Sequence, residues 1–361
     1  MSLLICIPEY IYEVGLAQRL GIDLFGGAEV VHGPVTVAIK SDPRTKVVVK
    51  KWWCAINHHA QRTEDLSWAD CVICYTGELV NGPWEWYHKL TVKQFNNTNF
   101  ISVSTGKSGL DQCPEHLVYD DLGHFFSRIV DVCRYEYWNT LPAKPKLFDA
   151  LLGIAKPHRV FIFSRLKATG LLDKSFVNIH GEVEYVSPDL HDFDDPTITT
   201  VDRKRSMRKV PGLANGIGVS HSIPLGIYQN SWYSIVAETN PANSNFLTEK
   251  TAKPLFEKKL FVLFGSQGLL ARLHSMGYKT FSSIIDESYD QEPVDRKRWR
   301  MAFDQVVKLS TQDHEAVYRQ IEPILEHNHK HICDQHYRLN GLGSFLKQHL
   351  LTVDREKQYA I

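Results

Sequence analysis

Short β-rich runs alternate with longer mixed segments along most of the chain, and this rhythm constrains the fold more than any other feature of the sequence. In the first half the runs are LLICIP, VTVAI, KVVVKKWW, DCVICYT and NFISVS, and the segments between them can hold helices or loops. Parallel strands need long crossover connections, and strands buried on both faces read as nearly continuous apolar runs. The first half therefore predicts an α/β domain with a mainly parallel sheet.

A second α/β series begins with HRVFIFSRL, which we expect to be a strand followed by a basic loop. It continues through SFVNIHG, WYSIVAET, the helix TEKTAKPLFEKK and the strand KLFVLFG. Residues 139–157 carry three prolines around a short helical piece, which is typical of a hinge between domains. The last fifty residues have a helical apolar rhythm. We therefore expect an N-terminal Rossmann-like domain over 1–150, a second such domain over 151–310 and C-terminal helices over 311–361.

Composition excludes several classes of protein. The 361 residues, 43% of them hydrophobic, suffice for two domains with separate cores. Lys plus Arg equals Asp plus Glu at 41 each, so any attraction to nucleic acid or anionic lipid must come from local patches. No apolar run approaches the roughly 20 residues of a membrane helix, and the N-terminus lacks the basic start of a secretory signal. We expect a cytoplasmic protein without a membrane span.

The seven cysteines show no spacing typical of a disulfide framework, which favours a reducing compartment. Cys71 and Cys74 form a CxxC inside the apolar run DCVICYT, and no second CxxC completes a zinc site. We expect both to be buried strand cysteines.

The strand WYSIVAET leads into the segment with the clearest chemistry. Its polar residues are Glu238 at the strand end, Asn240 in the loop, and Thr248, Glu249 and Lys250 at the head of the next helix. A carboxylate can accept hydrogen bonds from ribose hydroxyls, and a lysine near a helix N-terminus supplies a charge for a diphosphate. Pro254 supports a helix that begins just before it. Taken alone, these residues form either a phosphate-binding turn or a solvated loop with a helix cap.

The run ETN…NFLTEKTAKPLFEKKLFVLFGSQGLLARLHSMGYKTF…DESYD resembles the donor-binding half of fucosyltransferase-like enzymes. It is more similar still to a group of glycosyltransferase-like proteins encoded by bacteriophages. The resemblance covers about residues 156–300 and is weaker over 1–150. It implies the GT-B architecture, in which two Rossmann-like domains face a cleft, and a UDP-sugar or GDP-sugar donor held without an obligatory metal.

The resemblance also implies roles for single residues. Glu238 is expected to bind the donor ribose, Lys250 to neutralise the diphosphate, and Glu249 to orient the loop or contact the sugar. Asn240 and Thr248 belong to the same expected donor site.

Arg165 and the DESYD segment of the second series each have two interpretations, whereas Arg159 has one. Arg165 is expected at the carboxyl end of the strand RVFIFS, where it can contact phosphate or form a surface salt bridge. Arg159, at the start of that strand, is expected at the opposite edge of the sheet. Asp286, Glu287 and Tyr289 match the phage-type group but can equally fix a loop.

Sugar transfer needs a group that removes the acceptor proton, and the resemblance places it in the N-terminal domain. We expect it at a strand end, with Glu78 slightly favoured over His58 and Glu9, and with Glu13 and His59 as neighbours of the same kind. The pair Gly26–Gly27 resembles the glycine turn by which many glycosyltransferases bring backbone close to the donor.

Two patterns offer metal ligands, and we expect neither to bind metal. Asp192 and Asp194 form a DxD in an acidic insertion, where such a tripeptide readily arises by chance. His327, His329, His331, Cys333 and His336 lie close together in the sequence, but we expect them on an exposed polar helix.

A basic run lies at 203–209 and consists of Arg203, Lys204, Arg205, Arg208 and Lys209. It is either a solvated loop or a contact for a polyanion such as double-stranded DNA. Trp52, Trp53, Trp84 and Trp86 can stack on an extruded base or lie in the core. The resemblance makes a hydroxymethylated pyrimidine of phage DNA in the host cytoplasm the first acceptor to test. The alternatives are a glycan, lipopolysaccharide or small-molecule acceptor, and a nucleotide-binding or DNA-binding protein without transfer activity.

Overall fold

The computed structural model describes part of the chain, and the statements below concern these residues: 3–7, 29–32, 36–52, 65–76, 96, 100–104, 118–120, 144–188, 207–208, 217–218, 223, 225–239 and 247–334. The chain divides into two compact units, Met1–Asp121 with Asp334–Ile361, and Leu122–Cys333. The sequence analysis instead placed boundaries after residues 150 and 310. Each unit is described by itself.

The first unit contains a six-stranded sheet in which every pairing is parallel. Its strands are β1 (Leu3–Ile7), β2 (Glu29–His32), β3 (Thr45–Trp52), β4 (Cys71–Thr76), β5 (Phe100–Ser104) and β6 (Val118–Asp120), in the order β2-β1-β3-β4-β5-β6. The predicted parallel sheet is thereby confirmed. The run VTVAI is not a strand, because Thr36 caps the short helix α2 (Val37–Lys40) by accepting from the Ile39 N–H.

The second unit contains a five-stranded sheet in the order β13-β12-β7-β8-β9. Its strands are β7 (Lys146–Ile154), β8 (Ser175–His180), β9 (Tyr185–Val186), β12 (Ser231–Ala237) and β13 (Phe261–Phe264), and only the β8–β9 pair is antiparallel. From β7 the chain proceeds to β8 on one side, and from β12 it proceeds to β13 on the other. The strand order therefore reverses between β7 and β12, as in doubly wound nucleotide-binding folds. A separate ribbon pairs β10 (Met207–Arg208) with β11 (Ile217–Gly218).

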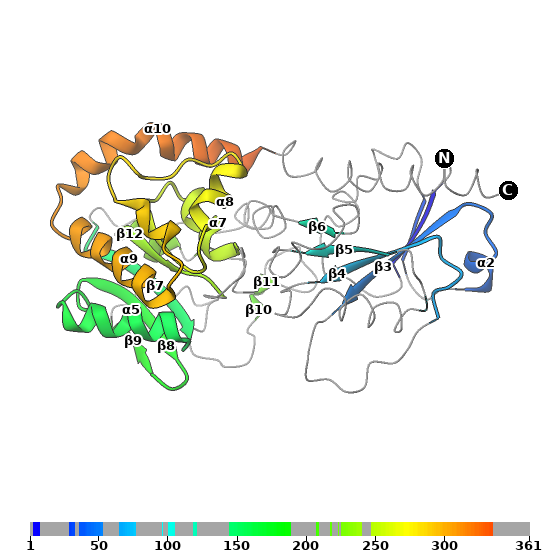
Figure 1. Ribbon diagram of the computed structural model, residues 1–361, viewed down its shortest axis with the longest axis horizontal. Coiled ribbons are helices and arrows are strands. Elements are labelled where there is room, and N and C mark those ends of the chain that lie inside the picture. Colours follow the sequence, from blue (N-terminus) through cyan, green and yellow to red (C-terminus); the bar gives the residue numbers. More distant parts are fainter. Residues whose placement is uncertain are drawn as a thin grey trace. The chain divides into compact units, whose positions relative to one another are not determined.

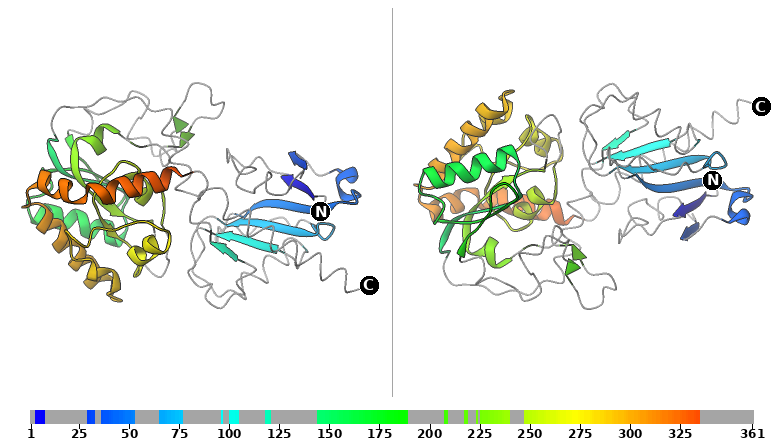
Figure 2. Two further views of the ribbon diagram at one scale, coloured as in Figure 1. Left: turned by 90° about the horizontal axis from the view of Figure 1, so that it is seen from above. Right: turned by 90° about the horizontal axis from the view of Figure 1, so that it is seen from below.

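Helices cover both faces of the second sheet (Figure 1). They are α5 (Pro157–Ala168), α6 (Leu225–Gln229), α7 (Glu249–Phe256), α8 (Leu269–Ser275), the 3-10 helix η5 (Glu287–Gln291), α9 (Asp295–Leu309) and α10 (His314–Cys333). Figure 2 shows α5 and α9 together on one face and α10 on the opposite face, where it packs against α7. Right-handed crossovers that start at the switch point and run in opposite directions place their helices on opposite faces of the sheet.

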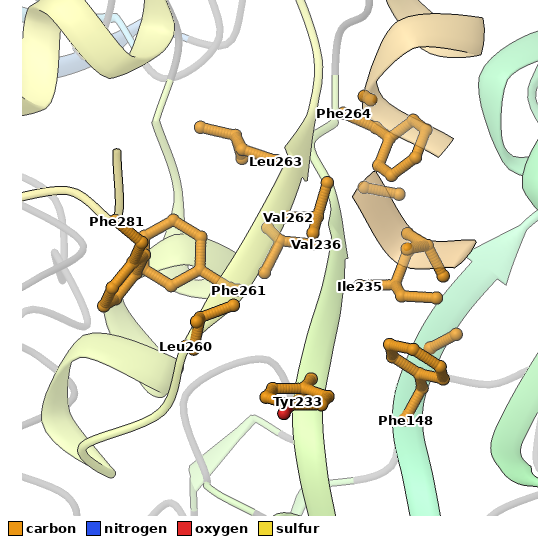
Figure 3. Packing of buried hydrophobic residues seen from close by; sticks show 14 of the residues in the cluster. Phe148, Tyr233, Ile235, Val236, Leu260, Phe261, Val262, Leu263, Phe264 and Phe281 are labelled. Atoms are coloured by element: carbon orange, nitrogen blue, oxygen red, sulfur yellow. The ribbon is translucent and has the colours of Figure 1, made fainter. Parts of the chain in front are cut away.

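Aromatic and aliphatic side chains from adjacent strands fill the core of this unit (Figure 3). Phe148 of β7 lies against Tyr233 of β12 with ring centroids 5.7 Å apart, and Phe261 of β13 meets Phe281 edge-on at 5.3 Å. At the amino-terminal end of the sheet, Lys259 Nζ donates to Asp149 Oδ2 at 2.7 Å, and both side chains are almost fully buried.

Two sequence predictions in this unit were wrong. HRVFIFSRL forms most of helix α5 rather than a strand, because Pro157 begins the helix and His158, Ile162 and Leu166 are buried at helical spacing. KLFDALLGI forms strand β7 rather than a helical hinge piece, and it lies in the middle of the sheet. Val160 and Ile162 favour a strand locally in the first segment, whereas the prolines that flank the second segment suggested a hinge.

None of the helices in the described ranges combines the length and the apolar character that a membrane crossing requires.

Candidate functional site

The candidate site lies at the carboxyl edge of the second sheet, where β7 and β12 end side by side. Along the chain, α5 is the helix that follows β7, and α7 is the helix that follows β12. Both helices therefore present their N-termini, which carry partial positive charge, to the switch point of the sheet. This is the position at which doubly wound sheets bind phosphate-bearing ligands.

The turn between β7 and α5 is shaped by Gly153 and Lys156. Gly153 has φ of +64° and lies at a register shift in the β7–β8 pairing, a conformation that glycine adopts without strain. Lys156 is the N-cap of α5 and makes no side-chain cap to the helix. Its Nζ instead donates to the backbone oxygen of Thr239 at 2.5 Å. A lysine of one turn thus reaches the end of the neighbouring strand.

His158 and Arg159 tie α5 to the end of β12. His158 is fully buried, and its Nε2 must donate to the Glu238 carbonyl oxygen, which lies 2.8 Å away. Arg159 donates to the carbonyls of Ile154 at 3.0 Å and Ala237 at 3.3 Å. Burial lowers the pKa of His158 to about 3, against the opposing effect of its bond to Glu238. Arg159 was predicted at the opposite edge of the sheet, and that prediction fails because its segment is a helix rather than a strand.

Glu238 is fully buried, and the chain itself uses both of its carboxylate oxygens. Oε1 accepts from the Thr248 N–H at 2.9 Å and from the Thr251 hydroxyl at 2.5 Å. Oε2 accepts from the Thr248 hydroxyl at 2.6 Å and from the Thr239 N–H at 3.3 Å. In this structure the carboxylate therefore fastens the head of α7 to the end of β12 and does not face solvent.

Thr248, Glu249 and Lys250 open helix α7 as the sequence indicated. Thr248 is the N-cap and accepts from the Lys250 N–H at 3.3 Å. The partly buried Lys250 Nζ donates to Glu249 Oε1 at 2.7 Å and to Thr239 Oγ1 at 3.1 Å. Burial raises the pKa of Glu249, but the charges of Lys250 and Lys253 outweigh it and the net pKa is lowered. Pro254 lies inside this helix rather than at its start.

Thr239 is therefore the meeting point of two ammonium groups. Lys156 reaches its backbone oxygen from α5, and Lys250 reaches its hydroxyl from α7. Lys250 was predicted from the sequence, whereas Lys156 and His158 were missed and Arg159 was placed at the wrong edge of the sheet. The available signal was the sequence KPHR, in which a proline follows a lysine directly after a predicted apolar segment.

Arg165 does not lie at a strand end. It is exposed in the last turn of α5, and its guanidinium carbon lies 5.4 Å from the centre of the Phe303 ring of α9. The predicted phosphate contact at the carboxyl end of a strand was wrong, because RVFIFS is helical.

The DESYD element fixes a loop of the second unit. Asp286 caps η5 by accepting from the Ser288 N–H at 2.9 Å, and Glu287 accepts from the Thr280 hydroxyl at 2.7 Å. Tyr289 is buried, and the neighbouring Asp290 accepts from the Leu270 and Ala271 N–H groups that begin α8. These contacts agree with the interpretation that Asp286, Glu287 and Tyr289 fix a loop.

The histidines of α10 contact the ends of two other helices. His329 Nδ1 bonds the carbonyl of Phe256 at the end of α7, while His331 Nε2 and His327 Nε2 bond the carbonyls of Met276 and Gly277 after α8. They are partly buried rather than on an exposed face. No group of three or more potential metal ligands occurs within the described ranges.

Many predicted positions lie outside the described residues: Glu9, Glu13, Gly26, Gly27, Trp53, His58, His59, Glu78, Trp84, Trp86, Asp192, Asp194, Arg203, Lys204, Arg205, Lys209, Asn240 and His336. Trp52 lies in β3, Cys74 in β4 and Arg208 in β10, and only the backbone of these three residues is described. Cys71 is a buried strand residue, as predicted.

No protein-family model, curated protein or solved structure matches this chain.

Proposed function

We propose that this protein is a nucleotide-sugar-dependent glycosyltransferase whose second unit holds the donor between the ends of β7 and β12. The observation that carries the proposal is the pair of ammonium groups, Lys156 and Lys250, that approach Thr239 from two different helix N-termini. The sequence resemblance over about 156–300 supplies the sugar-nucleotide chemistry, and the geometry supports a diphosphate at this point.

A diphosphate suits the electrostatics of this edge. It carries more than one negative charge, and here it would meet two ammonium groups and the positive ends of the α5 and α7 dipoles. Lys250 also pairs with the carboxylate of Glu249. A bound diphosphate would replace Thr239 as the partner of Lys156 and Lys250, and each lysine would move little.

Glu238 takes a different role from the one implied by the resemblance. Its carboxylate is buried and bonded to Thr248 and Thr251, so we assign it as a positioning residue. By fastening the N-cap of α7, it fixes the start of the helix that carries Lys250. The ribose hydroxyls would then bind other groups of the same edge.

For the acceptor half, we propose that the first unit forms the second Rossmann-like domain of a GT-B enzyme and that closure excludes water from the reaction. Glu78, His58 and Glu9 remain the candidates for the general base, and a hydroxymethylated pyrimidine of double-stranded DNA is the proposed acceptor. The acceptor oxygen would bond to the anomeric carbon, the bond from that carbon to the diphosphate would break, and the base would take the hydroxyl proton.

Mass spectrometry of nucleosides tests this proposal directly. Hydroxymethylcytosine DNA is incubated with the protein and each of a panel of UDP-sugars and GDP-sugars, then digested to nucleosides. We expect one donor to add the mass of its sugar to hydroxymethylcytosine, and the Lys156→Ala and Lys250→Ala variants to slow the reaction strongly. Release of nucleoside diphosphate without modified nucleoside would move the acceptor to a glycan, lipopolysaccharide or small molecule. Absence of both products with every donor would contradict the glycosyltransferase assignment.

A further inference from the structure

The two helices on one face of the second unit carry a strong local excess of positive charge. Helix α5, PHRVFIFSRLKA, contains three Lys or Arg residues and no carboxylate. Helix α9, DRKRWRMAFDQVVKL, contains five Lys or Arg residues and two carboxylates. Arg159 and Arg298 are buried, and the other six cationic residues are exposed: Arg165, Lys167, Arg296, Lys297, Arg300 and Lys308. Because the chain as a whole is neutral, this excess of positive charge is local to the two helices.

The positions of three arginines follow from the packing of these helices, which lie side by side in Figures 1 and 2. Trp299 and Phe303 of α9 contact Phe161 of α5, with ring centroids 6.1 Å and 6.3 Å apart. Residues three apart are neighbours on a helix surface. Arg296 therefore lies beside Trp299, and Arg300 lies beside Phe303.

Arg165 completes this set from the other helix. Its guanidinium lies over Phe303, at the same boundary between α5 and α9. Arg165, Arg296 and Arg300 are all exposed, and we call them the arginine face. The face is built on the outer side of two packed helices, so it suits an extended partner that lies across it.

Helix stability does not account for Arg296 and Arg300. Arg296 stands in the first turn of α9, where the helix dipole disfavours cations, and Arg300 stands in the second turn, where the dipole has little effect. Neither forms an ion pair with a described residue, although Asp304 follows Arg300 by one turn. Their neighbours are used differently, since Lys297 pairs with Glu292 and the buried Arg298 holds the Gly265 carbonyl.

We propose that the arginine face binds the phosphate backbone of a nucleic acid without reading its bases. Arginine forms two parallel hydrogen bonds to a phosphate, and Arg296 and Arg300 are spaced by about 6 Å along the helix axis. A duplex presents about one negative charge per 1.7 Å of its axis, so several of its phosphates lie within reach of three neighbouring arginines. Charge complementarity thus favours a nucleic acid over an acidic protein segment, whose carboxylates are more sparse.

This inference deepens the acceptor half of the proposed function but does not need the enzyme to be active. It also does not depend on the basic run at 203–209, whose side chains are not described. Binding of a fluorescent duplex of random sequence can therefore be measured by anisotropy on the full chain without any donor.

The test compares two double variants that remove equal charge. Arg296→Gln with Arg300→Gln changes the arginine face, whereas Arg319→Gln with Lys330→Gln changes exposed positions of α10 on the opposite face. We expect the first double variant to weaken duplex binding about tenfold or more and to reduce the slope of log K against log salt by about 2. The second double variant should change neither the affinity nor this slope appreciably. Circular dichroism melts would show that both variants fold.

Equal weakening by the two double variants would overturn the proposal, as would unchanged binding in the first. Displacement of the duplex by poly-aspartate at equal charge concentration would also overturn it, because the surface would then accept acidic chains equally. A duplex-binding defect in a protein that ignores every nucleotide sugar would reject the proposed enzyme and keep this surface. Normal donor binding without duplex binding would reject the arginine face as a nucleic-acid site and keep the proposed donor site.

Discussion

The Thr248 hydroxyl donates to Oε2 of Glu238 at 2.6 Å, while the Thr248 backbone N–H donates to Oε1 of the same carboxylate at 2.9 Å. One buried residue at a strand end thereby holds the N-cap of the helix that follows. The head of α7, with Lys250 in its first turn, is fixed by this bidentate contact and not by ligand.

Replacement of Glu238 by glutamine should reduce stability more than expected for a neutral isostere. The amide keeps one acceptor oxygen but turns its NH2 donor toward a backbone N–H that cannot accept, either that of Thr248 or that of Thr239. We expect a loss of about 1.5–3 kcal/mol in the free energy of unfolding, measured by urea denaturation. Glu322→Gln on the exposed side of α10 should change it by less than about 0.5 kcal/mol. Unchanged stability of Glu238→Gln together with lost nucleotide binding would instead indicate direct ligand contact.

His158 should make the protein less stable as the solution becomes more acidic. Burial lowers its pKa from 6.5 to about 3, so the folded state binds fewer protons than the unfolded state between these values. The free energy of unfolding should therefore fall as the pH decreases through this window, by up to about 1.4 kcal/mol per pH unit from this residue. His158→Gln should show a shallower dependence, because glutamine does not titrate. An identical pH dependence in both proteins would argue against a neutral buried His158.

Breaking the buried ion pair between Asp149 and Lys259 should lower the free energy of unfolding strongly. Lys259 Nζ also donates to the Tyr228 and Ser231 carbonyls, so its removal leaves several buried acceptors and one charge without their donor. We expect Lys259→Met to cost about 3–5 kcal/mol of unfolding free energy. Lys258→Met, which removes a more exposed pair with Glu326, should cost no more than about 1 kcal/mol. Equal costs for these adjacent lysines would contradict the buried arrangement.

Cys71 should be unreactive in the folded protein. Burial in β4 raises the pKa of its thiol to about 12, so almost no thiolate forms at pH 8. Mass spectrometry after iodoacetamide treatment should find Cys71 unmodified in the native protein and modified after unfolding in urea, whereas the partly exposed Cys333 should react earlier. Labelling of Cys71 at the rate of Cys333 in native buffer would show that the strand is accessible.

Apolar runs identified most strands, because parallel strands buried on both faces leave a simple signal. WYSIVAET and KLFVLFG are examples, and the helix head at Thr248 was visible from its capping residue. HRVFIFSRL was misread because β-branched and aromatic residues favour strands locally, whereas a helix there buries Ile162 and Leu166 against the sheet.

Only half of the candidate site could be predicted from the sequence. Lys250 lies at the head of the helix that follows the predicted strand, so its place at the sheet edge could be inferred from the sequence. Lys156 reaches Thr239 across 83 positions of the chain, and this contact exists only because β7 and β12 are neighbours in the sheet. Glu238 was placed correctly at the strand end, but its burial depends on Thr251, one turn inside the next helix.

Binding of nucleotide sugars to the second unit is the most direct test of the central claim. Calorimetric titration with UDP-sugars and GDP-sugars should detect at least one donor that binds the unmodified protein. Lys156→Ala and Lys250→Ala should each weaken it tenfold or more, while Lys330→Ala on α10 should leave its affinity unchanged. If every donor fails to bind, or if the tightest donor binds all three variants equally well, the carboxyl edge between β7 and β12 is not the donor site.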